Sequence, residues 1–204
     1  MSIVLKVKQV QKVFEKLEYE VTQLQKNTGI YCLTSCGQCC TKPNIEASVL
    51  EFLPLAFDLF LRKETTQFKE QVLQTDLAIC HLFNPLSLKP NNNYIIGKCT
   101  HYQYRALVCR LFSYASIRNK VGQKKLSTCK LIKGTFPDEV AKLDQPEEIE
   151  LIPNYSNYFQ QLVQIDFRLS QEFHPINKAI LRAIDEVESY YSYRNFPYRY
   201  KKRA

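Results

Sequence analysis

The chain has 204 residues, of which 45% are hydrophobic and 24% are charged. This composition supports a packed core and excludes wholesale disorder, while 5 glycines and 9 prolines exclude collagen-like or linker-like chains. The net charge is +8, and residues 190–204 carry five cations and no acid. The rest of the chain is therefore only mildly basic.

Membrane and export signals are missing from the sequence pattern. No apolar run reaches the roughly 20 residues that a membrane-spanning helix needs. Charges are spread through the first twenty residues, unlike the uncharged middle of a signal peptide. We therefore expect a soluble, cytoplasmic protein without a membrane span. Thiols stay reduced in that compartment, so disulfides are not the expected use of the eight cysteines.

The first segment has a clear helical period. Apolar residues spaced by three and four form one stripe, comprising Val7, Val10, Phe14, Leu17, Val21 and Leu24. Asn27 and Gly29 are plausible stop signals for this helix. The stripe fits either a coiled-coil contact with a partner or a helix packed on its own domain. Because it spans only about three heptads, we favour packing on its own domain.

Further helices are predicted on both sides of the middle of the chain. A helix rich in Leu and Phe is expected over 46–62, with a kink at Pro54, and a more polar helix over 65–77. Towards the C-terminus, apolar spacing predicts a helix over 155–169. Another helix is expected to start at Pro175, a residue well suited to a first helical turn.

Between about 80 and 133 the helical periodicity fades. Residues 94–96 are the one good strand candidate, as the first half of a small hairpin that turns near Gly97. Turn signals also occur at Asn84-Pro85, Lys89-Pro90 and Asn91-Asn92-Asn93. Such a long irregular stretch is uncommon in a compact domain unless something else supports it. Bound metal would supply that support.

These patterns predict a mainly α-helical fold. We expect a single cysteine-cluster domain over 1–189, in which helices at both ends flank an irregular, cysteine-rich metal-binding centre with one short β-hairpin. Residues 190–204 are expected to form a basic, Tyr-rich tail.

The cysteines are the candidate metal ligands. Thiolates suit zinc, iron and iron–sulfur clusters, and Gly37 gives the backbone freedom for a turn that presents Cys36 and Cys39 together. The side chains of Cys39 and Cys40 diverge, so the two are expected to serve different centres unless one is spare. Eight thiols allow two sites of four, or one four-iron cluster with four thiols left over. The candidates are Cys32, Cys36, Cys39, Cys40, Cys80, Cys99, Cys109 and Cys129.

Spacing alone leaves the partition of these thiols open. Our preferred division places Cys36, Cys39, Cys99 and Cys109 at one centre and leaves Cys32, Cys40, Cys80 and Cys129 for another. The alternatives are cysteines that act as small buried hydrophobes, a disulfide between two of them, or a zinc site that only staples the fold.

The cysteine pattern resembles the YkgJ-type cysteine-cluster family, which is known as a zinc- or iron-chelating domain with a CxxCxxCC-like signature. The run from Cys32 to Cys40 is similar to the opening motif of the family, and Cys80-His81-Leu82 to its middle step. The closing stretch is similar over Cys99-x-x-Tyr102 and Arg105-x-x-x-Cys109-Arg110-x-Phe112, and Cys129 matches a late cysteine. The resemblance covers about 32–130, with His101 and Ala106 where the family usually has Ile and Pro. It implies cysteine-bound zinc or iron–sulfur but no settled reaction.

Charged and imidazole side chains lie beside the cysteines in sequence. Lys98, Arg105 and Arg110 would offset the negative charge of a thiolate site or tune its potential, unless they are ordinary surface cations. His81 and His101 are possible ligands, but with enough thiols available we expect hydrogen-bonded or exposed histidines instead.

The leading functional hypothesis is a metal-binding protein that holds zinc or an iron–sulfur centre, with or without a redox or modifying activity. The alternative is a zinc-stapled interaction module without catalysis, whose basic tail contacts nucleic acid or an anionic surface. A charge run as short as 190–204 is more often a solvated terminus, so nucleic acid is not the expected partner. The sequence does not decide whether the protein is an enzyme.

Overall fold

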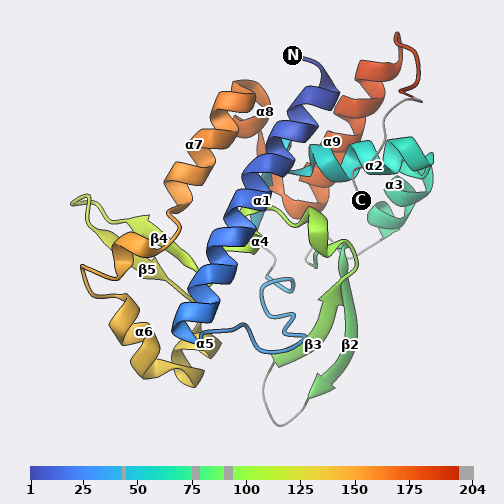
Figure 1. The fold of residues 1–204 in the computed structure, drawn as a ribbon. Coiled ribbons are helices and arrows are strands. Elements are labelled where there is room, and N and C mark those ends of the chain that lie inside the picture. Colours follow the sequence, from blue (N-terminus) through green and yellow to red (C-terminus); the bar gives the residue numbers. More distant parts are fainter. Residues whose placement is uncertain (43–44, 75–78, 90–93, 198–204) are drawn as a thin grey trace.

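The structure, a computed structural model, describes residues 1–42, 45–74, 79–89 and 94–197 (Figure 1). Within these residues the chain forms nine α-helices, three 3₁₀ helices and three two-stranded antiparallel sheets. The fold is therefore mainly α-helical, as the sequence predicts. None of the helices in the described residues is long and apolar enough to cross a membrane.

Helix α1 (Ile3–Thr28) runs through the middle of the molecule (Figure 1). Ser2 caps its start by accepting a hydrogen bond from the Leu5 amide, and Gly29 ends it in a left-handed conformation with φ 71°. The helix packs against α2, α4 and α7 of its own chain. This confirms packing on its own domain rather than a coiled coil with a partner. The stripe buried in these contacts consists of Ile3, Val7, Val10, Phe14, Leu17, Val21 and Leu24.

Helices from both halves of the chain surround α1. Helices α7 (Tyr155–Ile165) and α8 (Phe167–Gln171) lie on one side of it in Figure 1. Helices α2 (Leu53–Arg62), α3 (Thr65–Gln74) and α9 (Ile176–Tyr191) lie on the other side, where α2 and α9 pack together. The apolar faces of these helices form one continuous core.

The helix predicted over 46–62 is wrong in its first third. The segment begins with strand β1 (Glu46–Ser48), followed by the 3₁₀ helix η1 (Leu50–Phe52), before α2 begins. Strand β1 pairs with β6 (Phe173–Pro175), a partner far along the chain that local periodicity does not reveal. Pro54 produces no kink because it lies in the first turn of α2, where no helical hydrogen bond needs its missing N–H.

The C-terminal helices are predicted correctly except for one break. The helix expected over 155–169 divides at Asp166, whose carboxylate caps α8 by accepting a 2.9 Å hydrogen bond from the Leu169 amide. The 3₁₀ helix η3 (Ile149–Leu151) precedes α7. Helix α9 follows Pro175, as predicted.

Part of the predicted tail packs on the fold, while residues 192–195 are exposed. Helix α9 extends to Tyr191, so the first two residues of 190–204 are helical. The ring of Tyr191 stacks on Phe60 of α2 with 4.9 Å between centroids, and Phe196 stacks on the same ring at 5.2 Å. Residues 198–204, which hold four of the five tail cations, lie outside the described residues.

The predicted strand at 94–96 is confirmed, but its place in the hairpin is not. It belongs to β3 (Tyr94–Cys99), the second strand of a hairpin whose first strand is β2 (Phe83–Lys89). Gly97 lies inside β3 opposite Pro85 and is not at the turn. The connection between the strands, with the predicted Asn91-Asn92-Asn93 turn, lies outside the described residues.

Several short elements lie where the sequence predicts irregular chain. These are α4 (Leu107–Leu111), the hairpin of β4 (Ala115–Arg118) and β5 (Lys124–Ser127), and the start of α5 (Lys130–Thr135). Helix α6 (Pro137–Leu143) follows in a segment for which no element is predicted. Each is seven residues or shorter, which is too short to show a clear hydrophobic period.

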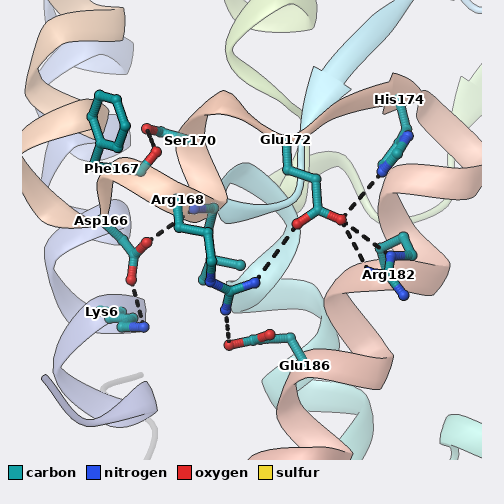
Figure 2. A network of polar contacts seen from close by, with 10 residues as sticks. Lys6, Asp166, Phe167, Arg168, Ser170, Glu172, His174, Arg182 and Glu186 are labelled. Atoms are coloured by element: carbon teal, nitrogen blue, oxygen red, sulfur yellow. Dashed lines mark hydrogen bonds and ion pairs between the residues drawn. The ribbon is translucent and has the colours of Figure 1, made fainter.

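A chain of ion pairs joins the N-terminal and C-terminal helices (Figure 2). The Lys6 ammonium of α1 lies 2.6 Å from the Asp166 carboxylate, and Arg168 of α8 pairs with Glu186 of α9 at 2.6 Å. The Glu172 carboxylate, next to β6, accepts hydrogen bonds from His174 and Arg182. The network lies away from the cysteines and ties α1 to the C-terminal part of the fold.

Candidate metal centre

The eight cysteines come from five segments of the chain. Four lie in the loop that follows α1, one precedes β2, one ends β3, one is in α4, and one is the N-cap of α5. Figure 1 shows the loop between α5 on one side and the β2–β3 hairpin on the other. In chain order these residues are Cys32, Cys36, Cys39, Cys40, Cys80, Cys99, Cys109 and Cys129.

Backbone hydrogen bonds fix the cysteine loop against the hairpin. The Gly97 amide donates to the Ser35 carbonyl at 2.8 Å, and Cys36 forms an isolated antiparallel bridge with Ile96. The Cys80 amide donates to the Cys40 carbonyl at 3.1 Å. The hairpin therefore brings the loop cysteines close to those at its own two ends.

A further hydrogen bond fixes the start of the loop. The Cys32 amide donates to the Tyr114 hydroxyl at 2.7 Å. Tyr114 lies just before strand β4, so this contact links the loop to the segment that leads to Cys129. The structure thus brings the first and last cysteines of the sequence into one region.

All eight thiols are free; Cys32 is exposed and the other seven are partly buried. In the described part of the chain, no three Cys, His, Asp or Glu side chains are arranged so that they could hold a metal ion as they stand. The thiols nevertheless lie near enough to affect one another's ionisation, and these effects show which of them are neighbours.

One group of neighbouring thiols joins the loop to α5. Although Cys32 is the most exposed of the eight residues, partial desolvation of its thiol, followed by the charges of nearby Cys36, Cys39 and Cys129, raises its pKa to about 12. Burial also raises the pKa of Cys36, with a smaller contribution from Cys129. The Cys129 sulfur itself accepts a 3.4 Å hydrogen bond from the Ile132 amide at the start of α5.

A second group joins the loop to the hairpin and α4. Burial raises the pKa of Cys80 to about 11, followed by the charges of Cys99 and Cys39. Burial is also the main cause that raises the pKa of Cys109, and the charges of Cys80 and Cys39 are the next largest causes. The pKa of Cys40 is raised partly by Cys80 and Cys109. Proximity therefore groups Cys80 with Cys109.

Cys39 and Cys40 lie where the two groups meet. Their Sγ atoms are 4.0 Å apart, so the divergence of these adjacent side chains that the sequence suggests is not observed. A hydrogen bond from Cys40 to the ionised Cys39 lowers the pKa of Cys39 to about 7 and raises that of Cys40. These neighbours differ from the partition suggested by spacing, because Cys36 lies with Cys32 and Cys129 and not with the cysteines of the hairpin and α4.

Two arginines connect the second group to α1. Glu18 of α1 accepts hydrogen bonds from Arg105 at 3.2 Å and from Arg110 at 2.8 Å. Arg110 is buried and also donates to the carbonyls of Arg105 and Gln103. The charge of Arg105 lowers the pKa of Cys39. The arginines are therefore held in an ion-pair network near the thiols, whereas Lys98 is exposed on β3.

Sequence reasoning missed the residue that fixes α4. Glu51 is buried with 2% of its surface exposed, and its carboxylate accepts a 2.5 Å hydrogen bond from the Leu107 amide. It also accepts hydrogen bonds from the amide and hydroxyl of Ser48. Glu51 thereby caps the helix that carries Cys109. The signal in the sequence is an acid inside an apolar run.

The histidines are placed as hydrogen-bonded or packed residues. His81 and His101 both contact the ring of Phe68 edge-on, at 5.1 and 5.9 Å between centroids. Burial lowers the pKa of both imidazoles. His101 also lies 3.0 Å from the Thr100 hydroxyl. Neither belongs to a group that could hold a metal among the described residues.

Free thiols that converge from distant segments are typical of cysteine-rich, metal-chelating domains. Comparison with family models agrees with this class: residues 31–130, which contain all eight cysteines, match the CxxCxxCC family, described as a putative zinc- or iron-chelating domain. The match agrees with the family that the cysteine pattern resembles. The description is consistent with zinc or an iron–sulfur cluster as the cofactor and does not choose between them. No curated protein and no solved structure matches the chain.

Proposed function

We propose that the eight cysteines bind zinc or iron in two adjacent thiolate sites, and that the metal holds the cysteine-rich centre together. The observation that carries this proposal is the convergence of eight free thiols from five segments on one region. The donor set fits soft metal centres, since it consists of sulfur atoms alone. Binding would turn the thiol side chains towards a common ion.

The neighbours of each thiol support a division into two sites. The Cys39 and Cys40 sulfur atoms are close together, so their other neighbours decide the assignment in this proposal. Cys40 is assigned with Cys80 and Cys109, which raise its pKa. Cys39, whose charge affects thiols of both groups, completes the first site with Cys32. The first site would be held by Cys32, Cys36, Cys39 and Cys129, and the second by Cys40, Cys80, Cys99 and Cys109.

A structural role for the metal is supported by the weakness of the elements it would connect. The sheets around the cysteines have two strands each, and an isolated two-stranded sheet is marginally stable in water. Helices α4 and α5 have five and six residues, too short to be stable alone. A structural zinc site contributes about 10 kcal/mol or more of folding free energy in small zinc domains. We therefore propose a metal-stapled module.

The alternative is a redox or modifying activity at an iron-containing centre. The observation in its favour is the cation Arg105, whose charge reaches Cys39, Cys99 and Cys109. Positive charge near an iron–sulfur cluster tunes its reduction potential. Iron could supply electron transfer, whereas zinc is not redox-active.

Metal analysis and thiol titration of anaerobically purified protein test the proposal. A zinc protein will be colourless, and a chelator will lower its melting temperature. An iron–sulfur protein will be brown, with broad absorption near roughly 400 nm. Eight reactive thiols with no bound metal would contradict both forms of the proposal.

Single serine substitutions test the division into two sites. We expect Cys109→Ser and Cys129→Ser each to lose about half of the bound metal, because each removes a ligand from only one site. The double variant should lose nearly all of it. Ser127→Ala, two residues before Cys129 and exposed, is the matched control and should keep the full metal content. Complete loss of metal in either single variant would show that the thiols form one centre.

A further inference from the structure

A groove with a volume of about 860 Å³ lies between α1 and the segment that follows β3. That segment contains the 3₁₀ helix η2 (Tyr102–Tyr104) and the two arginines paired with Glu18. None of the cysteines lines the groove. Its volume lies within the roughly 300–1,000 Å³ of small-molecule sites. The groove is therefore large enough for a ligand and separate from the thiols.

Cations line both walls of the groove. Lys8 and Lys12 are exposed one turn apart on α1, and neither makes an ion pair within the residues that the structure describes. Arg105 and Arg110 form the opposite wall. The structure thus places four cations around one hollow, two of them with their ammonium groups unneutralised.

The acids of the groove do not cancel these charges. Glu18 accepts hydrogen bonds from both arginines, and so is already neutralised. Glu51 is buried and accepts three hydrogen bonds, while Glu15 is exposed on α1. Even if Glu15 and Glu18 are both counted as negative, the four cations along the open part of the groove outnumber these two acids. The excess charge is positive and is shared between the two walls, and on the α1 wall it is carried by Lys8 and Lys12.

An aromatic ring forms part of the rim. Tyr102 is 59% exposed, and the Arg105 guanidinium lies 3.5 Å from the centroid of its ring. The guanidinium covers one face of the ring and fixes its orientation. A planar group could stack on the uncovered part of this ring while an anionic group reaches the lysines.

We propose that this groove binds a small molecule that combines a flat ring with a phosphate or carboxylate group. The oxyanion would be held by Lys8 and Lys12, with Arg105 fixing Tyr102 for stacking. This proposal does not depend on metal, because it uses side chains of α1, of η2 and of Arg105 just after it, and no thiol. It would stand if the cysteines bound nothing.

Calorimetric titration of the full chain with adenosine monophosphate tests the site, with adenosine as the neutral analogue. Phthalate, a flat dicarboxylate, is the second probe and distinguishes a carboxylate site from a phosphate site. We expect at least one anionic probe to bind saturably below about 10 mM, and adenosine to bind at least about tenfold more weakly than its monophosphate if phosphate is the recognised group.

A pair of double variants with equal charge provides the control. Lys8→Gln/Lys12→Gln should weaken binding of the anionic probe by about tenfold or more. Lys16→Gln/Lys26→Gln removes the same charge from α1 outside the groove, and should change binding by less than about twofold. Equal weakening in both variants, unchanged binding in the first, or no saturable binding of either anionic probe would overturn the proposal.

Discussion

At the scale of single residues, the buried acid Glu51 is the most constrained charge near the cysteines. Its three hydrogen bonds come from Ser48 and from the first amide of α4. Burial nevertheless dominates and raises the pKa of the carboxyl. The folded protein therefore keeps the Glu51 proton to a higher pH than the unfolded chain does. Stability contributed at this position falls as pH rises above the ordinary pKa of glutamate.

Replacing Glu51 with Gln tests this linkage. The amide does not titrate, so the free energy of unfolding of the unmodified protein, minus that of Glu51→Gln, should fall as pH rises from about 4 to 7. Chemical denaturation at several pH values measures it. Glu150→Gln makes the same chemical change at an acid whose side chain is 64% exposed, and serves as the surface control. If the unfolding free energy of the unmodified protein, minus that of Glu51→Gln, instead grows with pH, the hydrogen bonds to Glu51 outweigh burial in setting its pKa.

At the scale of elements, the β2–β3 hairpin shows why a glycine is needed inside a strand. A Cβ atom at Gly97 would collide with the Phe83 ring and lie 2.6 Å from the Asn84 carbonyl oxygen. The Gly97 amide also holds the cysteine loop through Ser35. Because backbone is among the colliding atoms, a side-chain rotation cannot relieve the clash.

We expect Gly97→Ala to lower the free energy of unfolding by about 2 kcal/mol or more, as the strand must shift to admit the methyl group. Gly134→Ala is the matched control: Gly134 is in α5, has nothing within 4 Å of an added Cβ, and should be neutral or stabilised by up to about 1 kcal/mol. Thermal and chemical denaturation of both variants compare them. Equal stability of the two variants would mean that the hairpin tolerates the methyl group.

Element prediction succeeded where the hydrophobic period was long. Helices α1 and α9 were identified from stripes that the structure buries. It failed for β1, whose partner β6 lies far away in sequence, and for β4 and β5, which have four residues each. Such elements are stabilised by pairing and not by local pattern, so a window of sequence holds little information about them.

At the scale of the whole molecule, α1 is tied by ion pairs to the cysteine-rich region, which follows it in the sequence. The helix lies before the residues matched by the family, yet Glu18 pairs with Arg105 and Arg110 inside them. The Arg110 side chain is 6% exposed, so its charge depends on this partner, while Glu18 is 44% exposed and partly screened by water. One ion-pair cluster therefore couples the N-terminal helix to the α4 segment.

Replacing Glu18 with Gln should loosen that coupling. We expect the free energy of unfolding to fall by about 1–2 kcal/mol and amide exchange to accelerate over residues 102–111, since Arg110 loses its carboxylate. Glu15→Gln, on the same helix and without an ion pair among the described residues, controls for the change in charge. Unchanged exchange over this segment in Glu18→Gln would contradict the coupling.

The sequence by itself determined the helical class of the fold, the buried stripe of α1, and the eight cysteines as the chemically distinctive groups. Those properties follow from residue type and short-range spacing. Only the tertiary structure decided which thiols are neighbours, that Glu18 and Glu51 hold the segments around them, and that α1 forms one wall of a cationic groove. These depend on contacts between segments far apart in the chain, which periodicity and local composition do not encode.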